Sequence, residues 1–168
     1  MSVFSISVSE LCWINGAKDD PQDLCLHGRV TAQIGDVILQ DEGTVSATAL
    51  YLLKTLTEDK IMSPYDIQMI PCCGHTILPD EAGENVIILG CDTGTDWSTS
   101  HAGGMIRIEL PSGKTELIDS AVYRDEVFRF ADRIEAFYNA CAPKMFDDDS
   151  EREGYAAFWN EWRRRRRT

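Results

Sequence analysis

LCLHGRVTAQIGDVIL, residues Leu24–Leu39, is the segment that most strongly predicts the fold class. From Leu24 to Ile34 apolar and polar residues alternate, which is typical of a strand with one buried face. Gly35-Asp36 has the composition of a two-residue hairpin turn, and Val37–Leu39 then returns as a second strand. Tight hairpins join antiparallel strands, so this segment predicts an antiparallel sheet with one face against a core.

The neighbouring segments extend this pattern in both directions. Phe4, Ile6 and Val8 alternate with serines, which predicts a first strand. After the hairpin the period changes, because apolar residues from Val45 to Leu56 recur at helical spacing; this helix is expected to end near residues 58–60. A second hairpin is predicted over residues 106–118, with its turn at Pro111-Ser112-Gly113.

Two further helices are predicted near the C-terminal end of the sequence. Apolar residues from Tyr123 to Cys141 follow a helical stripe, with Ser120 as the expected N-cap and Pro143 as the stop. Ser150 and Glu153 have the spacing of a capping box for a last helix. The apolar face of that helix consists of four aromatic residues: Tyr155, Phe158, Trp159 and Trp162.

Hairpins dominate and no regular alternation of strand and helix occurs. The expected fold is therefore α+β, a mainly antiparallel sheet of hairpins with about three helices packed against it. The 168 residues suit one globular domain, residues 1–168, with Arg163–Thr168 as a frayed basic end.

The window Pro71–His101 is rich in reactive side chains, because it contains three of the six cysteines and two of the three histidines. At its centre, Val86–Leu89 is a run of four apolar residues, which predicts a strand covered on both faces. The reactive residue types would then lie on the turns around a buried strand.

A zinc site is one interpretation of this window. Cys72-x-x-His75 has the spacing of a ligand pair, and Cys91 or His101 could complete it. A second closely spaced pair is missing, and Cys25-x-His27 suits a strand better than a zinc knuckle. We therefore expect no metal and no other cofactor.

A nucleophilic site is the other interpretation. It would combine three kinds of residue: a thiolate from Cys72, Cys73 or Cys91, a base from His75 or His101, and an orienting carboxylate from Asp92 or Asp96. No local signature of a cysteine enzyme surrounds these residues, so the sequence favours a protein that is not an enzyme. A small enzyme or zinc protein centred on Cys72–His101 remains the alternative.

The net charge of −12 is the most unusual property of the composition. Five of the sixteen basic residues form the run Arg163–Arg167, which leaves 11 basic against 28 acidic residues, a charge of −17, on the rest of the chain. Such a body would repel nucleic acid and anionic membranes. The sequence lacks an apolar run long enough for a membrane span and begins without a basic signal-peptide region. We therefore expect a cytoplasmic protein with reduced cysteines.

The acidic body suits a basic protein partner. In size, charge and class the chain resembles the immunity proteins that bacteria keep in the cytoplasm to neutralise toxin domains, and this resemblance implies an inhibitor that binds its partner. Candidate contact residues lie in three acidic clusters: Asp19, Asp20 and Asp23; Asp80, Glu81 and Glu84; Asp147, Asp148, Asp149 and Glu151. Trp97 or Trp13 would be the buried anchor of the interface.

Overall fold

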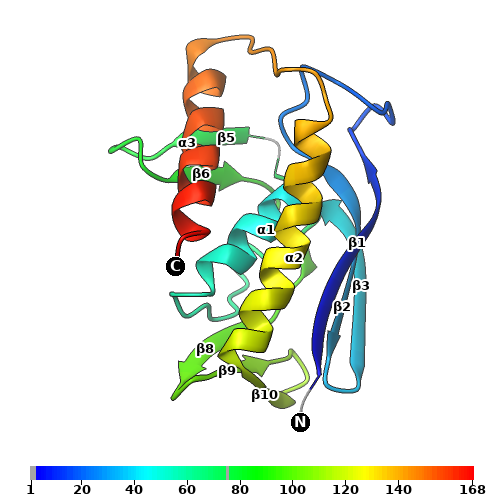
Figure 1. Cartoon of the computed structure of the whole chain (residues 1–168), viewed down its shortest axis with the longest axis vertical. Helices are drawn as coiled ribbons and strands as arrows, with labels where there is room; N and C mark the ends of the chain where they lie inside the picture. Colours follow the sequence, from blue (N-terminus) through cyan, green and yellow to red (C-terminus); the bar gives the residue numbers. More distant parts are fainter. Residues whose placement is uncertain (1–2, 75) are drawn as a thin grey trace.

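The computed structural model describes residues 3–74 and 76–168 and confirms an α+β fold (Figure 1). Within these residues there are three helices and four small antiparallel sheets, with strand orders β1-β2-β3, β10-β9-β8, β4-β7 and β5-β6. The elements are β1 Phe4–Cys12, β2 His27–Ile34, β3 Val37–Thr44, α1 Val45–Lys54, β4 Ile70–Pro71, β5 Thr76–Pro79, β6 Val86–Leu89, β7 Gly94–Thr95, β8 Ser98–Ala102, β9 Met105–Glu109, β10 Thr115–Asp119, α2 Ser120–Asn139 and α3 Asp149–Arg165.

The predicted hairpin is the centre of the first sheet. Ile34 pairs with Val37 across the Gly35-Asp36 turn, and β1 joins the other edge of β2. The alternating residues of β2 are buried as expected, since Val30 and Ile34 are fully enclosed. Helix α2 covers the inner face of this sheet, where Phe4 and Tyr123 stack with ring centroids 4.6 Å apart.

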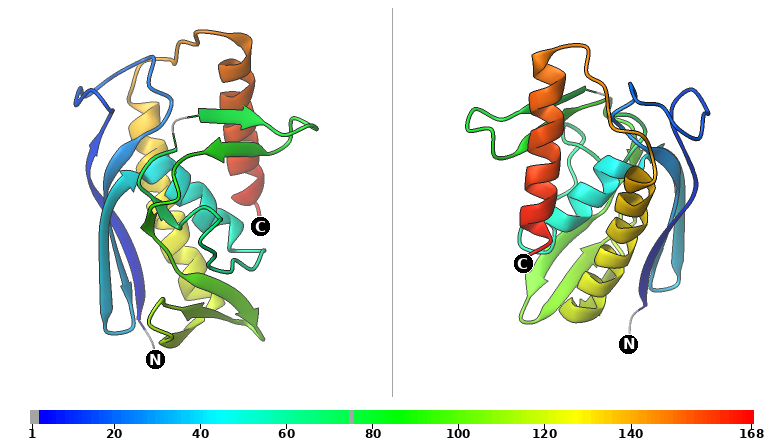
Figure 2. Two further views of the ribbon diagram at one scale, coloured as in Figure 1. Left: turned by 180° about the vertical axis from the view of Figure 1, so that it is seen from behind. Right: turned by 45° about the horizontal axis from the view of Figure 1, so that its top comes forward.

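Helix α1 lies at the centre of the core. It lies between the first sheet, α2 and α3 (Figure 2), and it is buried on nearly every side, including the polar residues Ser46 and Thr48. The helix ends at Lys54, earlier than the sequence pattern predicted. Thr55 follows as its cap, where its hydroxyl donates to the Leu52 carbonyl at 2.7 Å and lies 2.8 Å from the hydroxyl of Tyr123.

The caps of the two longer helices differ from those predicted. At the start of α2, Asp119 rather than Ser120 is the N-cap, and its carboxylate accepts from the amides of Ala121 and Val122. At the start of α3, Asp148 accepts from the amide of Glu151, so the capping residues precede the predicted pair by two positions. Carboxylates cap these helix starts well, because the amides there carry partial positive charge.

The β5–β6 hairpin packs against α3 through one face only. Gly154 permits this close contact, because a Cβ atom there would lie 2.0 Å from the carbonyl oxygen of Ile77. The prediction that Val86–Leu89 is covered on both faces is therefore wrong. Ile87 is 46% exposed and Leu89 is 51% exposed, since the sheet has two strands and no helix lies on its outer face in the described part of the chain.

The arginine run is held by the fold rather than frayed. Arg165 donates to Glu161 at 3.1 Å and to Glu58 at 2.5 Å. Arg166 pairs with Asp132 and lies over the ring of Phe128. The run therefore forms the docked end of α3, because partners for its guanidinium groups come from distant parts of the chain. Among the described helices, none combines the length and apolar character needed to cross a membrane.

Candidate functional site

The structure gathers three thiols on two loops that are distant in sequence. Cys72 and Cys73 follow β4, whereas Cys91 follows β6. Their sulfur atoms all lie within 4.8 Å of one another. Cys72 and Cys91 are exposed and Cys73 is half-buried, so solvent and small ions can reach the group. We call these three residues the thiol cluster.

Short pairings between the loops explain why the thiols meet. Ile70–Pro71 pairs with Gly94–Thr95, and the amide of Cys72 donates to the carbonyl of Thr93 at 3.1 Å. Glycine is needed where the loops touch. At Gly94, whose φ is 142°, a Cβ atom would lie 2.2 Å from the Ile70 carbonyl oxygen.

Hydrogen bonds among these side chains lower the pKa of Cys91. The pKa of Cys73 is raised, because its side-chain hydrogen bond with Cys91 and its partial burial together outweigh the bond from the Cys91 amide. The Thr93 hydroxyl lies 2.8 Å from Cys72 Sγ and 3.0 Å from Cys91 Sγ, and the amide of Cys91 donates to Cys73 Sγ at 3.0 Å. Hydrogen bonds from Cys72, Thr93 and Cys73 to the sulfur of Cys91 lower its pKa to about 6. These contacts therefore favour the thiolate form of Cys91, the form that binds metals and attacks electrophiles.

A cavity of about 250 Å³ adjoins the thiol cluster at Cys72. Arg29 spans its mouth, with one guanidinium nitrogen 2.8 Å from Glu10 and another 2.5 Å from Glu42. Cys12 and His27 also line this space. By contrast, Cys25 lies in the core, where burial raises the pKa of its thiol to about 12.

Of the described candidate residues in the window, only the cysteines come together. Asp96 has a structural role, because its carboxylate accepts from Lys60 Nζ at 2.5 Å and from the amide of Met69 at 2.8 Å. Asp92 is exposed. His75 lies outside the described residues. The predicted catalytic combination of thiol, base and carboxylate is therefore not assembled by the residues that the structure describes.

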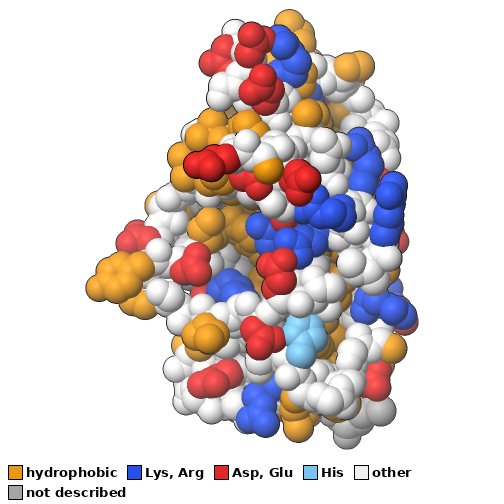
Figure 3. All heavy atoms as spheres, turned by 90° about the vertical axis from the view of Figure 1, so that its left-hand side faces the viewer, with side chains coloured by type: hydrophobic (Ala, Val, Ile, Leu, Met, Phe, Trp, Pro, Cys, Tyr) orange, Lys and Arg blue, Asp and Glu red, His pale blue; other side chains and the backbone are white. Residues whose placement is uncertain are grey.

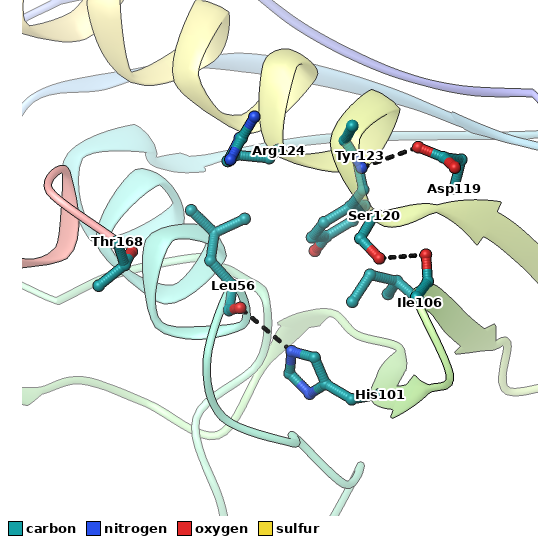
Figure 4. Close-up of a pocket in the computed structure, with 10 residues that line it drawn as sticks. Leu56, His101, Ile106, Asp119, Ser120, Tyr123, Arg124 and Thr168 are labelled. Atoms are coloured by element: carbon teal, nitrogen blue, oxygen red, sulfur yellow. Dashed lines mark hydrogen bonds between the residues drawn. The ribbon is translucent and has the colours of Figure 1, made fainter.

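His101 lies at a different cavity, of about 420 Å³, between β8, β9 and the start of α2 (Figure 4). Both ring nitrogens are engaged, Nδ1 with Asp59 at 2.7 Å and Nε2 with the Leu56 carbonyl at 3.1 Å. The hydrogen bond to Asp59 raises the pKa of His101. Ser120, also at this cavity, donates its hydroxyl to the Gly104 carbonyl. His101 thus ties β8 to the turn after α1, and neither nitrogen is available as a general base.

The predicted tryptophan anchors are not on the surface. Trp97 and Trp13 are both fully buried, so the structure corrects their assignment to a binding interface. In the second acidic cluster, Asp80 holds the β5–β6 turn, accepting from the Glu84 amide at 2.9 Å and from the Asn85 side chain at 2.7 Å. This aspartate serves the hairpin, whereas Glu81 and Glu84 are exposed at its tip.

The loops that carry the other two acidic clusters lie side by side. The Met145 amide donates to the Pro21 carbonyl at 2.9 Å, and the Ala142 amide donates to Asp19 at 2.8 Å, so the loop after β1 lies beside the connection from α2 to α3 (Figure 1). Acidic side chains lie at this end of the molecule, over the first turn of α3, together with a basic side chain (Figure 3). We call this surface the acidic end; it comprises Asp19, Asp20, Asp23, Asp147, Asp148, Asp149, Glu151, Ile14 and Met145.

Two of these residues are apolar side chains that the sequence analysis missed. Met145 is 61% exposed and Ile14 is 65% exposed, each beside the acidic residues of its own loop. Their only signal in the sequence is an apolar residue within a polar, acidic loop. Lys144 lies close to the first of the acidic clusters. Its ammonium group is 3.3 Å from the ring centre of Trp13, donates to the Asp20 carbonyl and is attracted by the carboxylates of Asp19, Asp20 and Asp23.

The chain was compared with protein-family models, with curated proteins and with solved structures, and none of them matches it.

Proposed function

We propose that the chain is a binding protein of the immunity type, which neutralises a basic partner protein such as a toxin domain. The observation that carries this proposal is that two loops bearing acidic clusters, more than 100 residues apart in sequence, lie side by side. Complementary charge speeds the encounter with a basic partner and disfavours partners of like charge.

The basic run does not offset the acidic end. Helix α3 spans Asp149–Arg165, so its basic terminus lies about 24 Å from its acidic one at 1.5 Å per residue. That separation is about three Debye lengths at physiological salt. Arg165 and Arg166 are also paired with acidic groups of the protein itself. A partner approaching the acidic end therefore meets an excess of negative charge, which Lys144 and Arg152, the latter paired with Asp149, offset only in part.

Ile14 and Met145 supply the equilibrium affinity that exposed charges do not. Exposed charges at the rim of an interface contribute little equilibrium affinity, whereas a few side chains that become buried contribute most of it. A flexible thioether such as that of Met145 also adapts to an irregular partner surface. We therefore assign fast association with the partner to the carboxylates and slow dissociation to these two apolar side chains.

An enzyme centred on the thiols is the less favoured function. It needs a base beside a thiol and a carboxylate to orient that base. Of the described candidates, the base His101 is bonded to Asp59 and the carboxylate Asp96 to Lys60. The acidic end requires no such assembly, because a binding surface acts through the side chains already exposed on it.

The experiment isolates a partner and then tests the surface. The full chain is used at low salt to capture proteins of its source organism, and a captured basic protein is purified for kinetic and activity assays. Asp147→Lys should slow association severalfold with a weaker salt dependence, and Met145→Ala should speed dissociation. Asp125→Lys is the matched control, because Asp125 is an exposed residue near the opposite end of α2.

Two results would contradict the proposal. One is a partner whose activity is not inhibited, or whose binding ignores both substitutions at the acidic end. The other is the absence of any basic partner together with a small-molecule turnover that Cys91→Ala abolishes. Thermal unfolding of each variant shows whether a loss of binding reflects a loss of folding.

A further inference from the structure

We propose that Cys72, Cys73 and Cys91 form a three-thiolate site for a thiophilic metal ion, with zinc as the expected occupant. The sequence spacing disfavoured a metal because a second closely spaced ligand pair was missing. The fold supplies the missing ligands in another way, by placing adjacent Cys72 and Cys73 against Cys91 from a separate loop.

The distances fit a zinc ion. Zinc–sulfur bonds of about 2.3 Å in a tetrahedron place the sulfurs about 3.8 Å apart. The three sulfurs here lie within 4.8 Å of one another, so they need to close by about 1 Å or less. Rotation of the cysteine side chains between staggered positions moves a sulfur farther than this. The exposed sulfurs of Cys72 and Cys91 leave a path for the ion.

The backbone around the thiol cluster is built for close approach. At Gly90 a Cβ atom would lie 2.6 Å from the carbonyl oxygen of Cys73, and at Gly43, on the neighbouring strand β3, it would lie 2.1 Å from that of Pro71. Together with Gly94, these glycines let three segments touch through their main chains. The thiols are therefore held near one another by the fold before an ion binds, which reduces the cost of ordering them.

The surroundings of the sulfurs suit metal-bound thiolates. The Cys91 amide donates to Cys73 Sγ at 3.0 Å, and the Thr93 hydroxyl lies within 3.0 Å of the sulfurs of both Cys72 and Cys91. Donors of this kind orient the ligands of a metal site and offset their negative charge. With three protein ligands, a zinc ion keeps a fourth position for water or another ligand.

This site is separate from the acidic end, so the proposal stands whether or not a basic partner is found. No disulfide links the described cysteines, so all three thiols of the cluster are free to bind an ion. Thiolates are soft ligands, and they bind zinc in preference to magnesium or calcium.

The experiment titrates the full chain, purified under reducing conditions and freed of metal, with zinc in competition with a chromophoric chelator. Cobalt is then substituted, because cobalt–thiolate charge-transfer absorption reports how many sulfurs bind. We expect one ion per chain with the absorption of three thiolates. Cys72→Ser, Cys73→Ser and Cys91→Ser should each weaken binding by more than the roughly 10- to 100-fold that loss of an outer-shell partner costs.

Cys141→Ser and Ser112→Ala are the control variants, since Cys141 is a half-buried thiol outside the thiol cluster and Ser112 is an exposed residue of the β9–β10 turn. They should leave stoichiometry and affinity unchanged, and metal-free melting temperatures should show that every variant folds. The proposal is overturned by binding no tighter than in the triple serine variant, by cobalt spectra without thiolate bands, or by reduced thiols that form a disulfide in preference to binding zinc.

Discussion

Glu161 is a fully buried carboxylate on α3, and Glu161→Gln is expected to destabilise the protein by about 2 kcal/mol. One oxygen accepts from the Val86 amide at 2.9 Å, which holds the hairpin to the helix. The other accepts from Arg165 at 3.1 Å and lies 3.3 Å from Lys54 Nζ, which holds α3 to α1. The substitution keeps the shape of the side chain and an oxygen acceptor, and it removes the charge.

The magnitude follows from these contacts. Hydrogen bonds to charged groups contribute about 1.5–3 kcal/mol each, against about 1 for neutral ones. Lys54 and Arg165 are partly exposed and can be solvated when the carboxylate is lost, so the full 3–5 kcal/mol of a broken buried pair is not expected. A loss of about 2 kcal/mol corresponds to a fall of about 4–8 °C in Tm for a chain of this size.

The assay is urea and thermal unfolding of both proteins, with an unchanged urea dependence of the free energy to show that the denatured states are comparable. Glu153→Gln, an exposed position on the same helix, is the control and should change stability by less than about 0.5 kcal/mol. If Glu161→Gln changed stability no more than the control, Glu161 would not join the three elements as described.

Three further changes test other contacts. Deleting residues 164–168 should lower Tm by several degrees, because the deletion removes ion pairs of the docked end of α3. An unchanged Tm would show that this segment is frayed, as the sequence predicted. Asp59→Asn should remove the bond that raises the pKa of His101. The wild type should then be more stable than the variant below about pH 6.5, and this difference should disappear as pH rises through the raised pKa of His101. Urea unfolding from pH 5 to 9 measures the difference, and a difference that does not change with pH would contradict this reasoning. Gly94→Ala should destabilise by more than about 1 kcal/mol and weaken zinc binding, whereas Gly83→Ala, also at positive φ but in open space, should cost less and spare the metal.

Much of the secondary structure could be predicted from the sequence. The β2–β3 hairpin, the alternation in β9 and the stripes of α2 and α3 are set by interactions within a few residues, namely turn chemistry and side-chain periodicity. The errors arose where local patterns are ambiguous. Val86–Leu89 contains four apolar residues, and their composition does not tell whether one or both faces of the strand are covered.

The candidate sites depended far more on tertiary structure. The sequence drew attention to Cys72, Cys73 and Cys91 as reactive types, and it could not show that their sulfurs meet while Asp96 and His101 lie elsewhere. Two loops about 18 residues apart are brought together by backbone pairing at the short β4–β7 ladder and by glycine contacts, and neither leaves a periodic signal.

The sequence determined the amount of charge, and the tertiary structure determined where the charges lie. The sequence by itself determined the acidic excess, the helical faces and the antiparallel hairpins, because composition and local periodicity are properties of short segments. Only the tertiary structure decided that the loop of Asp19–Asp23 lies beside the connection from α2 to α3, that Trp97 is enclosed, and that Arg165 turns inward to Glu161. These outcomes depend on how α1, α2 and α3 pack around a shared core, and the energy of that packing is distributed over contacts between residues far apart in the chain.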